Sequence, residues 1–271
     1  IVGTATDMLD VTPAYFLTQG ATAYLMNTYQ WQNDDWNNET NIARETDGSV
    51  YMAGTFNSNP GDPAPNTAIM VRKISAGGTV IWTSTFSLTN SAYARSVALD
   101  GVGNLYVLVR GSDSTISVSK LDKFTGYIYG RSDFFNSNMY ADAYDIGADS
   151  DRAYVAGTIS SNASILFFAA DGSTTTVTSY NAANYSSAYA IDVNREVGRI
   201  ALAGTVYNGN YGNDIWAASY AKNLVPEAPP AFSLIWASTY APVNNHPEWG
   251  YDEAHGVKID KSSSVYVTGF Y

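Results

Sequence analysis

A glycine-aromatic phrase occurs five times along the chain, and this repeat constrains the fold more than any other feature. The copies are VYMAG at Val50–Gly54, LYVLV at Leu105–Val109, AYVAG at Ala153–Gly157, IALAG at Ile200–Gly204 and VYVTG at Val265–Gly269. Each copy follows a short polar turn, and each turn follows a run in which apolar and polar residues alternate. Alternation on both sides of a turn predicts a β-hairpin that is repeated along the chain.

The hairpin is part of a longer unit of four predicted strands. In the first complete unit the strands are expected at Asn41–Thr46, Val50–Thr55, Ala68–Ile74 and Thr79–Phe86. The first unit spans about residues 41–88. The same pattern returns over residues 92–134, 140–181 and 187–240, which gives four complete units. Four-stranded units repeated every ~50 residues are typical of the blades of a β-propeller.

The two ends of the chain each supply half a unit. Residues 251–271 contain only the first two strands of a unit, and residues 14–31 contain only the last two. Pairing them would close a ring and remove two exposed sheet edges. We therefore predict an all-β fold with a single domain over residues 1–271, a β-propeller of five four-stranded blades in which one blade is shared between the N- and C-terminal strands.

The segment Ile1–Pro13 exceeds what a closed ring needs. Its start, IVGT, resembles the end of a second strand, as in VAGT at Val155–Thr158. Three interpretations stay open, and one of them is that the chain is part of a larger repeat array. In the other two, the segment either lies along the rim of the propeller, or it pairs with a neighbouring subunit by strand addition and makes the protein self-assemble.

Charge and composition restrict the partners. The formal net charge is −11, with 14 basic and 25 acidic residues, which disfavours nucleic acid and anionic lipid. No apolar run reaches the ~18 residues that span a bilayer, so no membrane insertion is expected. The chain has no cysteine, which excludes disulfides and thiolate metal sites. Few lysines and many Ser, Thr, Asn and Tyr residues favour an extracellular or cell-surface protein, with glycosylation sequons at Asn38, Asn162 and Asn184.

Several phrases resemble a known repeat family. The stretches AHGVKIDKSSSVYVTGFY (Ala254–Tyr271), DIWAASYAKN (Asp214–Asn223) and LIWASTYA (Leu234–Ala241) are similar to the SBBP-type β-propeller repeats of bacteria and archaea. Val109 departs from the strand-ending glycine of that pattern, and Phe168 to Ala170 replace the expected lysine strand. The resemblance implies a secreted or cell-surface propeller with no common enzymatic activity.

One candidate site is formed by long loops that border the shared blade. It gathers aromatic and acidic residues: Trp31, Asp34, Asp35, Trp36, Tyr207, Tyr211, His246, Glu248 and Trp249. Aromatic faces stack on sugars and carboxylates accept hydroxyl hydrogen bonds, so this face is a candidate glycan site. The alternative is that the tryptophans pack on the rim and hold the loops.

A second candidate site is the central channel. Five positions before each turn the innermost strands carry Ile42, Arg95, Tyr144, Tyr189 and His255, and two positions before it they carry Glu45, Ala98, Gly147, Asp192 and Lys258. Among these, the candidate channel residues are Arg95, Tyr144, Tyr189, Asp192 and His255. A glycosidase would need two carboxylates at one level of the channel, and this pattern does not supply them.

The sequence predicts no cofactor and no metal site, with Ca²⁺ as the open alternative. Candidate oxygen ligands are Asp34 with Asp35, Asp62 with Asn57 and Asn59, and Asp149 with Asp151, although turn chemistry explains Asp149 more simply. We expect a non-enzymatic, structural or adhesive propeller module of a prokaryotic surface protein or assembly, with a glycan or a surface protein as partner. The alternatives are a lectin that uses the tryptophan-rich loops and a glycoside hydrolase that uses the channel.

Overall fold

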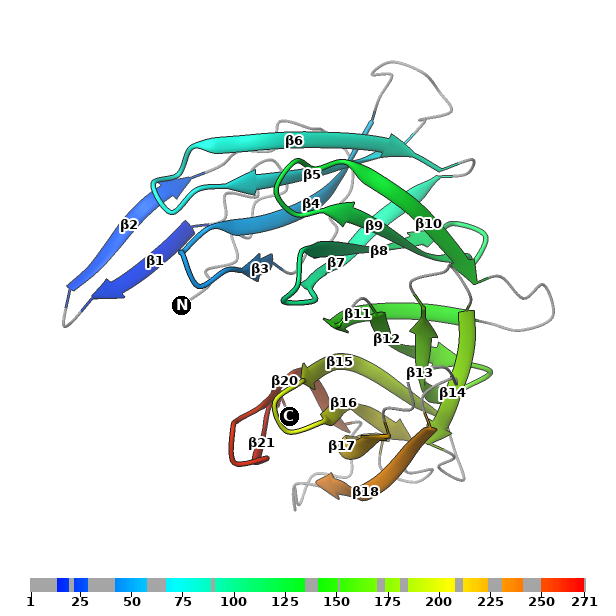
Figure 1. Ribbon diagram of the computed structural model, residues 1–271. Coiled ribbons are helices and arrows are strands. Elements are labelled where there is room, and N and C mark those ends of the chain that lie inside the picture. The colour runs from blue at the N-terminus through cyan, green and yellow to red at the C-terminus, as the bar shows by residue number, and fades with distance from the viewer. Residues whose placement is uncertain are drawn as a thin grey trace.

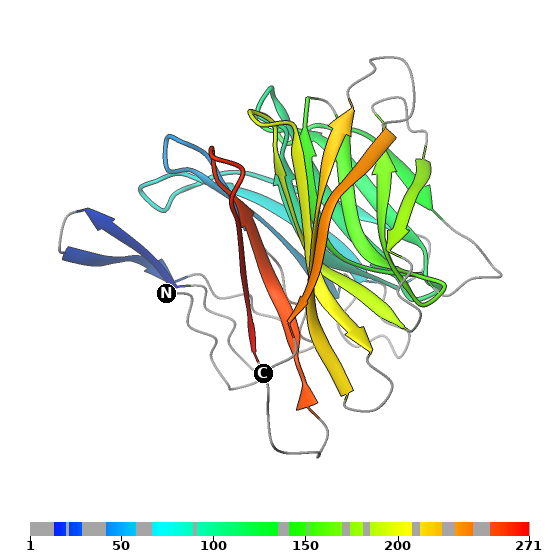
Figure 2. The same cartoon turned by 90° about the horizontal axis from the view of Figure 1, so that it is seen from below.

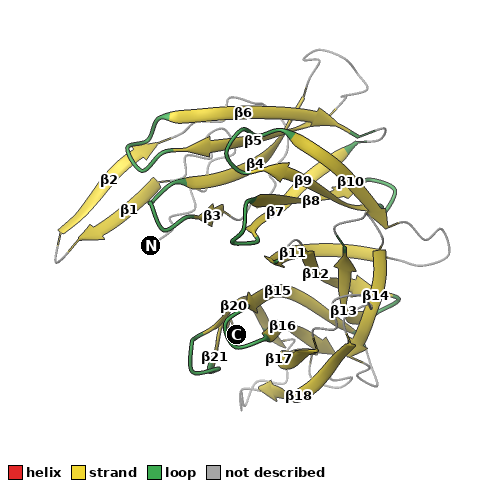
Figure 3. Ribbon diagram, in the orientation of Figure 1, coloured by secondary structure: helices red, strands yellow, loops and turns green. Residues whose placement is uncertain are grey.

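The structure of the protein is a computed structural model, and it describes most of the chain. The described residues are 14–19, 22–28, 42–57, 67–88, 91–134, 141–150, 152–169, 174–180, 185–207, 212–223, 231–240 and 250–270. Within these ranges the chain consists of strands and turns, with no helix (Figure 3). Accordingly, none of these ranges contains a helix long and apolar enough to cross a membrane.

Four antiparallel sheets of four strands follow one another along the chain (Figure 1). The first sheet contains β3 (Ile42–Arg44), β4 (Val50–Asn57), β5 (Thr67–Ile74) and β6 (Val80–Ser87), and the second contains β7 (Ala92–Leu99), β8 (Asn104–Gly111), β9 (Ile116–Asp122) and β10 (Ile128–Phe134). The third contains β11 (Ala141–Asp149), β12 (Arg152–Ile159), β13 (Asn162–Phe168) and β14 (Thr174–Tyr180). The fourth contains β15 (Ser186–Asn194), β16 (Arg199–Tyr207), β17 (Gly212–Asn223) and β18 (Ala231–Tyr240), with β19 (Gly250–Tyr251) added in parallel to β17.

The two ends of the chain form separate hairpins. β20 (Glu253–Ile259) pairs with β21 (Val265–Phe270), and β1 (Ala14–Gln19) pairs with β2 (Thr22–Thr28). The hairpins are two sheets of two strands each, and they stand apart in both views of the ribbon (Figures 1 and 2). The predicted all-β propeller is confirmed, and the strands of the shared blade form as expected without joining into one sheet. Ile1–Pro13 lies outside the described residues.

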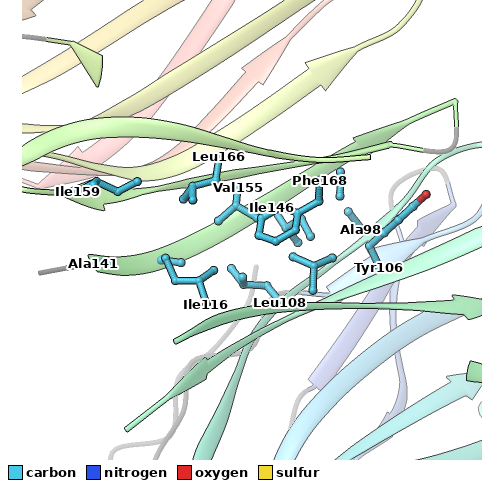
Figure 4. Packing of buried hydrophobic residues seen from close by; sticks show 13 residues of the cluster. Ala98, Tyr106, Leu108, Ile116, Ala141, Ile146, Val155, Ile159, Leu166 and Phe168 are labelled. Atoms are coloured by element: carbon cyan, nitrogen blue, oxygen red, sulfur yellow. The ribbon is translucent and has the colours of Figure 1, made fainter. Parts of the chain in front are cut away.

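The first strands of successive blades contact one another, which makes β3, β7, β11, β15 and β20 the innermost strands. Between blades, apolar side chains from facing sheets interlock. Figure 4 shows Ile146 and Val155 packed against Leu108 and Ile116 of the preceding blade, all four nearly or fully buried. Each such side chain contributes roughly 1.5–3 kcal/mol by leaving water, so the interfaces between blades are the hydrophobic core.

Polar contacts also join neighbouring blades. Glu45, at the end of the first blade's inner strand, accepts hydrogen bonds from Lys123 Nζ of the next blade at 2.6 Å, from Tyr51 Oη at 2.8 Å and from Lys73 Nζ at 3.1 Å. Burial alone would raise the pKa of the Glu45 carboxyl, but these three donors outweigh it and lower that pKa to about 2. The ionised carboxylate is therefore a structural link between two blades.

A similar link joins the third and fourth blades. Lys222 Nζ donates to the Asp149 carboxylate, and both side chains are 2% exposed. Burial lowers the pKa of Lys222, while the hydrogen bond and charge of Asp149 oppose that shift. Removing one partner of such a pair would leave a buried charge without compensation.

Replacing Glu45 by glutamine should destabilise the fold in a pH-dependent way. The pKa of Glu45 is lowered on folding, so its stabilising contribution is fully present above its ordinary pKa of 4.5 and is lost as the pH falls toward about 2. We expect E45Q to unfold in urea with about 1–3 kcal/mol less stability at pH 7, and the difference from the unchanged protein to shrink between pH 5 and pH 2.

The matched control is E196Q, which removes an exposed carboxylate 3.4 Å from Lys261 Nζ. Exposed pairs of this kind contribute little, so E196Q should stay within about 0.5 kcal/mol of the unchanged protein. A constant difference for E45Q across the whole pH range would contradict the assigned role of the ionised carboxylate.

Candidate functional site

Four of the innermost strands carry a β-bulge at the same place. The pairing with the second strand of the blade skips one residue in each case, between Ala94 and Ser96, Ala143 and Asp145, Ala188 and Ala190, and Ala254 and Gly256. The skipped residues are Arg95, Tyr144, Tyr189 and His255. A bulged residue is left out of the ladder and its side chain is redirected, which is why bulges often lie beside functional sites.

The strand-ending glycine of the repeated phrase accounts for the local backbone geometry. Gly157, Gly204 and Gly269 pair with the alanine that precedes each bulge. A Cβ on these glycines would lie 2.2, 2.0 and 2.1 Å from a carbonyl oxygen of the inner strand, on Asp142, Ser187 and Glu253 respectively. Only glycine allows this approach of the two backbones. The second blade keeps its bulge at Arg95 with Val109 in the glycine position.

The bulged side chains of three successive inner strands meet ring to ring. The Tyr144 and Tyr189 ring centroids are 4.8 Å apart in an edge-to-face arrangement, and the His255 ring stacks on Tyr189 at 5.3 Å. Phe270 of β21 stacks on the other face of His255, also at 5.3 Å. We call Tyr144, Tyr189, His255 and Phe270 the aromatic row.

The imidazole of the aromatic row has a carboxylate partner. His255 Nε2 lies 2.9 Å from Glu253 Oε2, on the same strand. When Nε2 carries the proton and donates it to Glu253, Nδ1 keeps its lone pair and is able to accept a proton. Half of the His255 side chain is exposed. The arrangement suits general-base chemistry beside flat aromatic surfaces.

A cavity of about 620 Å³ lies among the inner strands and includes His255 in its lining. Two carboxylates line it, and both are engaged. Asp145 accepts hydrogen bonds from Ser96 Oγ at 2.7 Å and from the Ile191 amide at 3.0 Å. Asp192 accepts from Lys258 Nζ at 2.5 Å and from the Ile259 amide at 2.8 Å. Because each carboxylate bridges neighbouring blades, these groups hold the channel together.

The structure brings together three of the five predicted channel residues, Tyr144, Tyr189 and His255, in the aromatic row. Arg95 occupies the equivalent bulge of β7, and its Nε is buried without a hydrogen-bond partner in the described part of the chain. Asp192 belongs to the pair with Lys258. At the remaining positions, Ile42 is exposed and Glu45 points to the lysines of its blade interface. Ala98 and Gly147 add no polar side chain. The binding role of these residues stays a prediction.

Almost all of the predicted loop site falls outside the described residues. This applies to Trp31, Asp34, Asp35, Trp36, Tyr211, His246, Glu248 and Trp249, and to the sequons at Asn38 and Asn184. Tyr207, the remaining member, is exposed at the end of β16. The candidate Ca²⁺ ligands Asn59, Asp62 and Asp151 are likewise not described, and the Asp149 carboxylate is engaged by Lys222. The described residues contain no group of three acidic or histidine side chains that would hold a metal.

Sequence reasoning missed two members of the site, Glu253 and Phe270. Glu253 stands two residues before His255, and residues two apart on a strand share a face, so the spacing already pointed to the pair. Phe270 follows the glycine of the last repeated phrase. Its position over His255 depends on the register in which β21 pairs with β20, and the residues around Phe270 do not indicate that register.

Comparisons with known proteins bear on the fold. No family model matches the chain, and no curated protein matches it. Among solved structures, a periplasmic gluconolactonase of Pseudomonas aeruginosa is similar with a TM-score of 0.59 and 12% identity, over 99% of this chain and 75% of that one. A subtype N10 neuraminidase-like protein of the A/little yellow-shouldered bat/Guatemala isolate is similar with a TM-score of 0.49 and 12% identity, over 96% of this chain and 85% of that one. At these identities the likeness shows the fold.

The likeness to the gluconolactonase corrects the expected function. The sequence predicted a non-enzymatic structural or adhesive module, but the solved propellers that this chain resembles include a gluconolactonase. The expectation of a non-enzymatic module is therefore contradicted. It was wrong because it rested on the repeat pattern, and a repeat specifies the scaffold without specifying the chemistry of the side chains that the scaffold presents. The expected extracellular location stays a prediction.

Replacing Gly204 by alanine should disturb the bulge that presents Tyr189. The added methyl group would have to displace the Ser187 carbonyl, 2.0 Å away, and overpacking of this kind costs about 1–3 kcal/mol. We expect G204A to lower the free energy of unfolding in urea by that amount and to alter the near-ultraviolet circular dichroism of the tyrosines. In the control G130A, the new methyl group would meet no atom within 4 Å. Equal stability of both variants would contradict the role given to Gly204.

Proposed function

We propose that this protein is a propeller hydrolase that opens a sugar-derived lactone at the aromatic row. The observation that carries the proposal is the His255–Glu253 pair, with a Nε2 to Oε2 distance of 2.9 Å, placed in a row of rings from three adjacent blade strands. The fold likeness to a gluconolactonase supports the choice of a cyclic sugar ester as substrate, although at 12% identity it carries no residue-level argument.

The aromatic row supplies the binding surface. The rings of Tyr144 and Tyr189 are half-buried, and each leaves part of its surface to solvent beside His255. The carbon-bound hydrogens of a sugar ring pack on such faces, while hydroxyl groups remain free to hydrogen-bond with tyrosine Oη and with water. A small polyhydroxylated ring therefore matches this surface better than a long apolar chain does.

His255 supplies the general base. Glu253 accepts a hydrogen bond from Nε2–H and orients the imidazole. Nδ1 then takes a proton from water as the water oxygen adds to the lactone carbonyl. The ring C–O bond then breaks, and the departing ring oxygen receives the proton from Nδ1. One water is consumed, one hydroxy acid is produced, and His255 returns to its starting state.

The test is the rate of lactone opening at constant pH, followed by the base needed to neutralise the acid produced. D-glucono-1,5-lactone is the first substrate, and the uncatalysed rate is subtracted. We expect H255Q to lower kcat by about 10²–10⁴-fold with little change in KM, because the side chain loses its basic nitrogen. E253Q should lower kcat less and shift its pH dependence, because Glu253 positions the imidazole.

The control is again E196Q, an exposed carboxylate that belongs to no part of the row and is expected to leave kcat and KM within twofold. A kcat of H255Q equal to that of the unchanged protein would contradict the role of His255 as the general base. A rate for the unchanged protein that never exceeds the uncatalysed rate, for this lactone and a panel of other sugar lactones, would contradict the proposed reaction.

A further inference from the structure

The last blade presents an open sheet edge. β20 and β21 form a sheet of two strands, whereas every other blade has four. Figure 1 shows β21 at the end of the succession of blades, and none of the strands in the described ranges pairs with its outer edge. Large side chains on this strand face solvent, with Tyr266 60% and Phe270 52% exposed. An apolar strand with an unpaired edge is a ready template for another strand.

The fourth blade, which faces the two-stranded last blade, exposes a tryptophan that is covered in the first blade. Trp82 of β6 is half-buried because it packs against the β9–β10 turn of the following blade, where its Nε1 donates to the Lys123 carbonyl at 3.2 Å. Trp236 of β18 stands at the matching place in the repeat, IWASTY against IWTSTF. It is 37% exposed, and among the described residues the following blade has only its first two strands, β20 and β21.

The hairpin β1–β2 has the size and pattern of the missing strands. Its strands contain six and seven residues, against eight each for β5 and β6. In the first complete blade an aromatic residue follows the hairpin glycine at the fourth position, from Gly78 to Trp82, and the same spacing leads from Gly20 to Tyr24. The hairpin is therefore the part of the chain that corresponds to a third and a fourth blade strand.

The repeat also gives the register of the missing pairing. In the first complete blade Ala53 pairs with Val71, and Lys73 pairs with Trp82. In the terminal hairpin Leu17 pairs with Tyr24, so Leu17 takes the place of Lys73. Counting two residues back, Tyr15 takes the place of Val71, although the pairing of β1 with β2 skips Tyr15. Thr268 takes the place of Ala53 in the repeated phrase. When the blade is complete, Thr268 is expected to lie opposite Tyr15.

We infer that the open edge of β21 receives the β1–β2 hairpin of a second copy of this chain, which makes the protein an oligomer by strand exchange. Within the chain the two hairpins form separate sheets that stand apart (Figures 1 and 2). The connection from β2 to β3 has 13 residues, 29–41, and the connections from β6, β10, β14 and β18 to the next inner strand have 4, 6, 5 and 12. Thirteen residues reach up to roughly 45 Å, enough to place the hairpin in a neighbouring ring.

The proposed exchange combines strand addition at a sheet edge with the swapping of an identical element between two copies of the chain. Backbone hydrogen bonds along β21 provide affinity, and burial of Trp236, Tyr266 and Phe270 provides the apolar gain. The hairpin would also cover Phe270, which stacks on His255, so exchange would complete the blade that carries the proposed base. The inference itself does not depend on the reaction, because it rests on strands and exposed side chains.

The absence of cysteine in the chain allows a direct cross-linking test. The variants T268C and Y15C are prepared separately, unfolded and refolded together, and oxidised. A disulfide between the two variants has to join different molecules, so a covalent species of twice 29.2 kDa on a non-reducing gel is the expected result. The control pair is S262C with Y15C, since Ser262 lies in the exposed turn at the far end of β21, and it should not cross-link above background.

The double variant T268C/Y15C distinguishes exchange from closure within one chain. Exchange predicts covalent dimers or longer chains after oxidation, together with a native mass by light scattering that is a multiple of 29.2 kDa. A cross-linked monomer would mean that the chain's own hairpin closes the blade and would overturn the inference. The lack of any cross-link would mean that the hairpin does not occupy the edge at all, which would overturn it as well. Neither result depends on the lactone assay.

Discussion

The β-bulge that four inner strands carry at the same position is the constraint on which the candidate site depends. With no Cβ, Gly157, Gly204 and Gly269 let the second strand of a blade lie against the first at the residue before each bulge. In four blades, including the second blade with Val109 in the glycine position, the bulge releases one residue from the ladder. Because the blades repeat around one set of inner strands, the released residues reach the same place, and Tyr144, Tyr189 and His255 touch one another there.

Acidic side chains in this propeller mostly serve its architecture. Glu45, Asp149 and Asp192 each accept hydrogen bonds from a lysine of the following blade. Asp145 accepts one from a backbone amide of the following blade. These contacts add directional links to interfaces that are otherwise apolar. Glu253 differs because its partner is an imidazole at the surface of the site, and this difference locates the proposed reaction there.

The sequence predicted the strands and the inner positions well, because both follow from a period that repeats five times. Tyr144, Tyr189 and His255 were identified from their distance to the turn, without knowledge of the bulge that makes this position special. Glu253 and Phe270 were missed because their roles depend on pairing between β20 and β21 and on ring contacts between blades. The function was misjudged for a different reason: composition describes the surface of a propeller, whereas chemistry depends on a few side chains at its axis.

The measurement that tests the central claim most directly is the histidine spectrum of the protein during titration with a sugar lactam, a stable analogue of the lactone. The chain has two histidines, His246 and His255, so ¹⁵N-labelled imidazoles give a spectrum with few signals that H255Q assigns. The account predicts that the ring nitrogen signals of His255 shift in a saturable manner and that those of His246 remain unchanged. Saturable binding that leaves the His255 signals in place would contradict the claim that the aromatic row is the site.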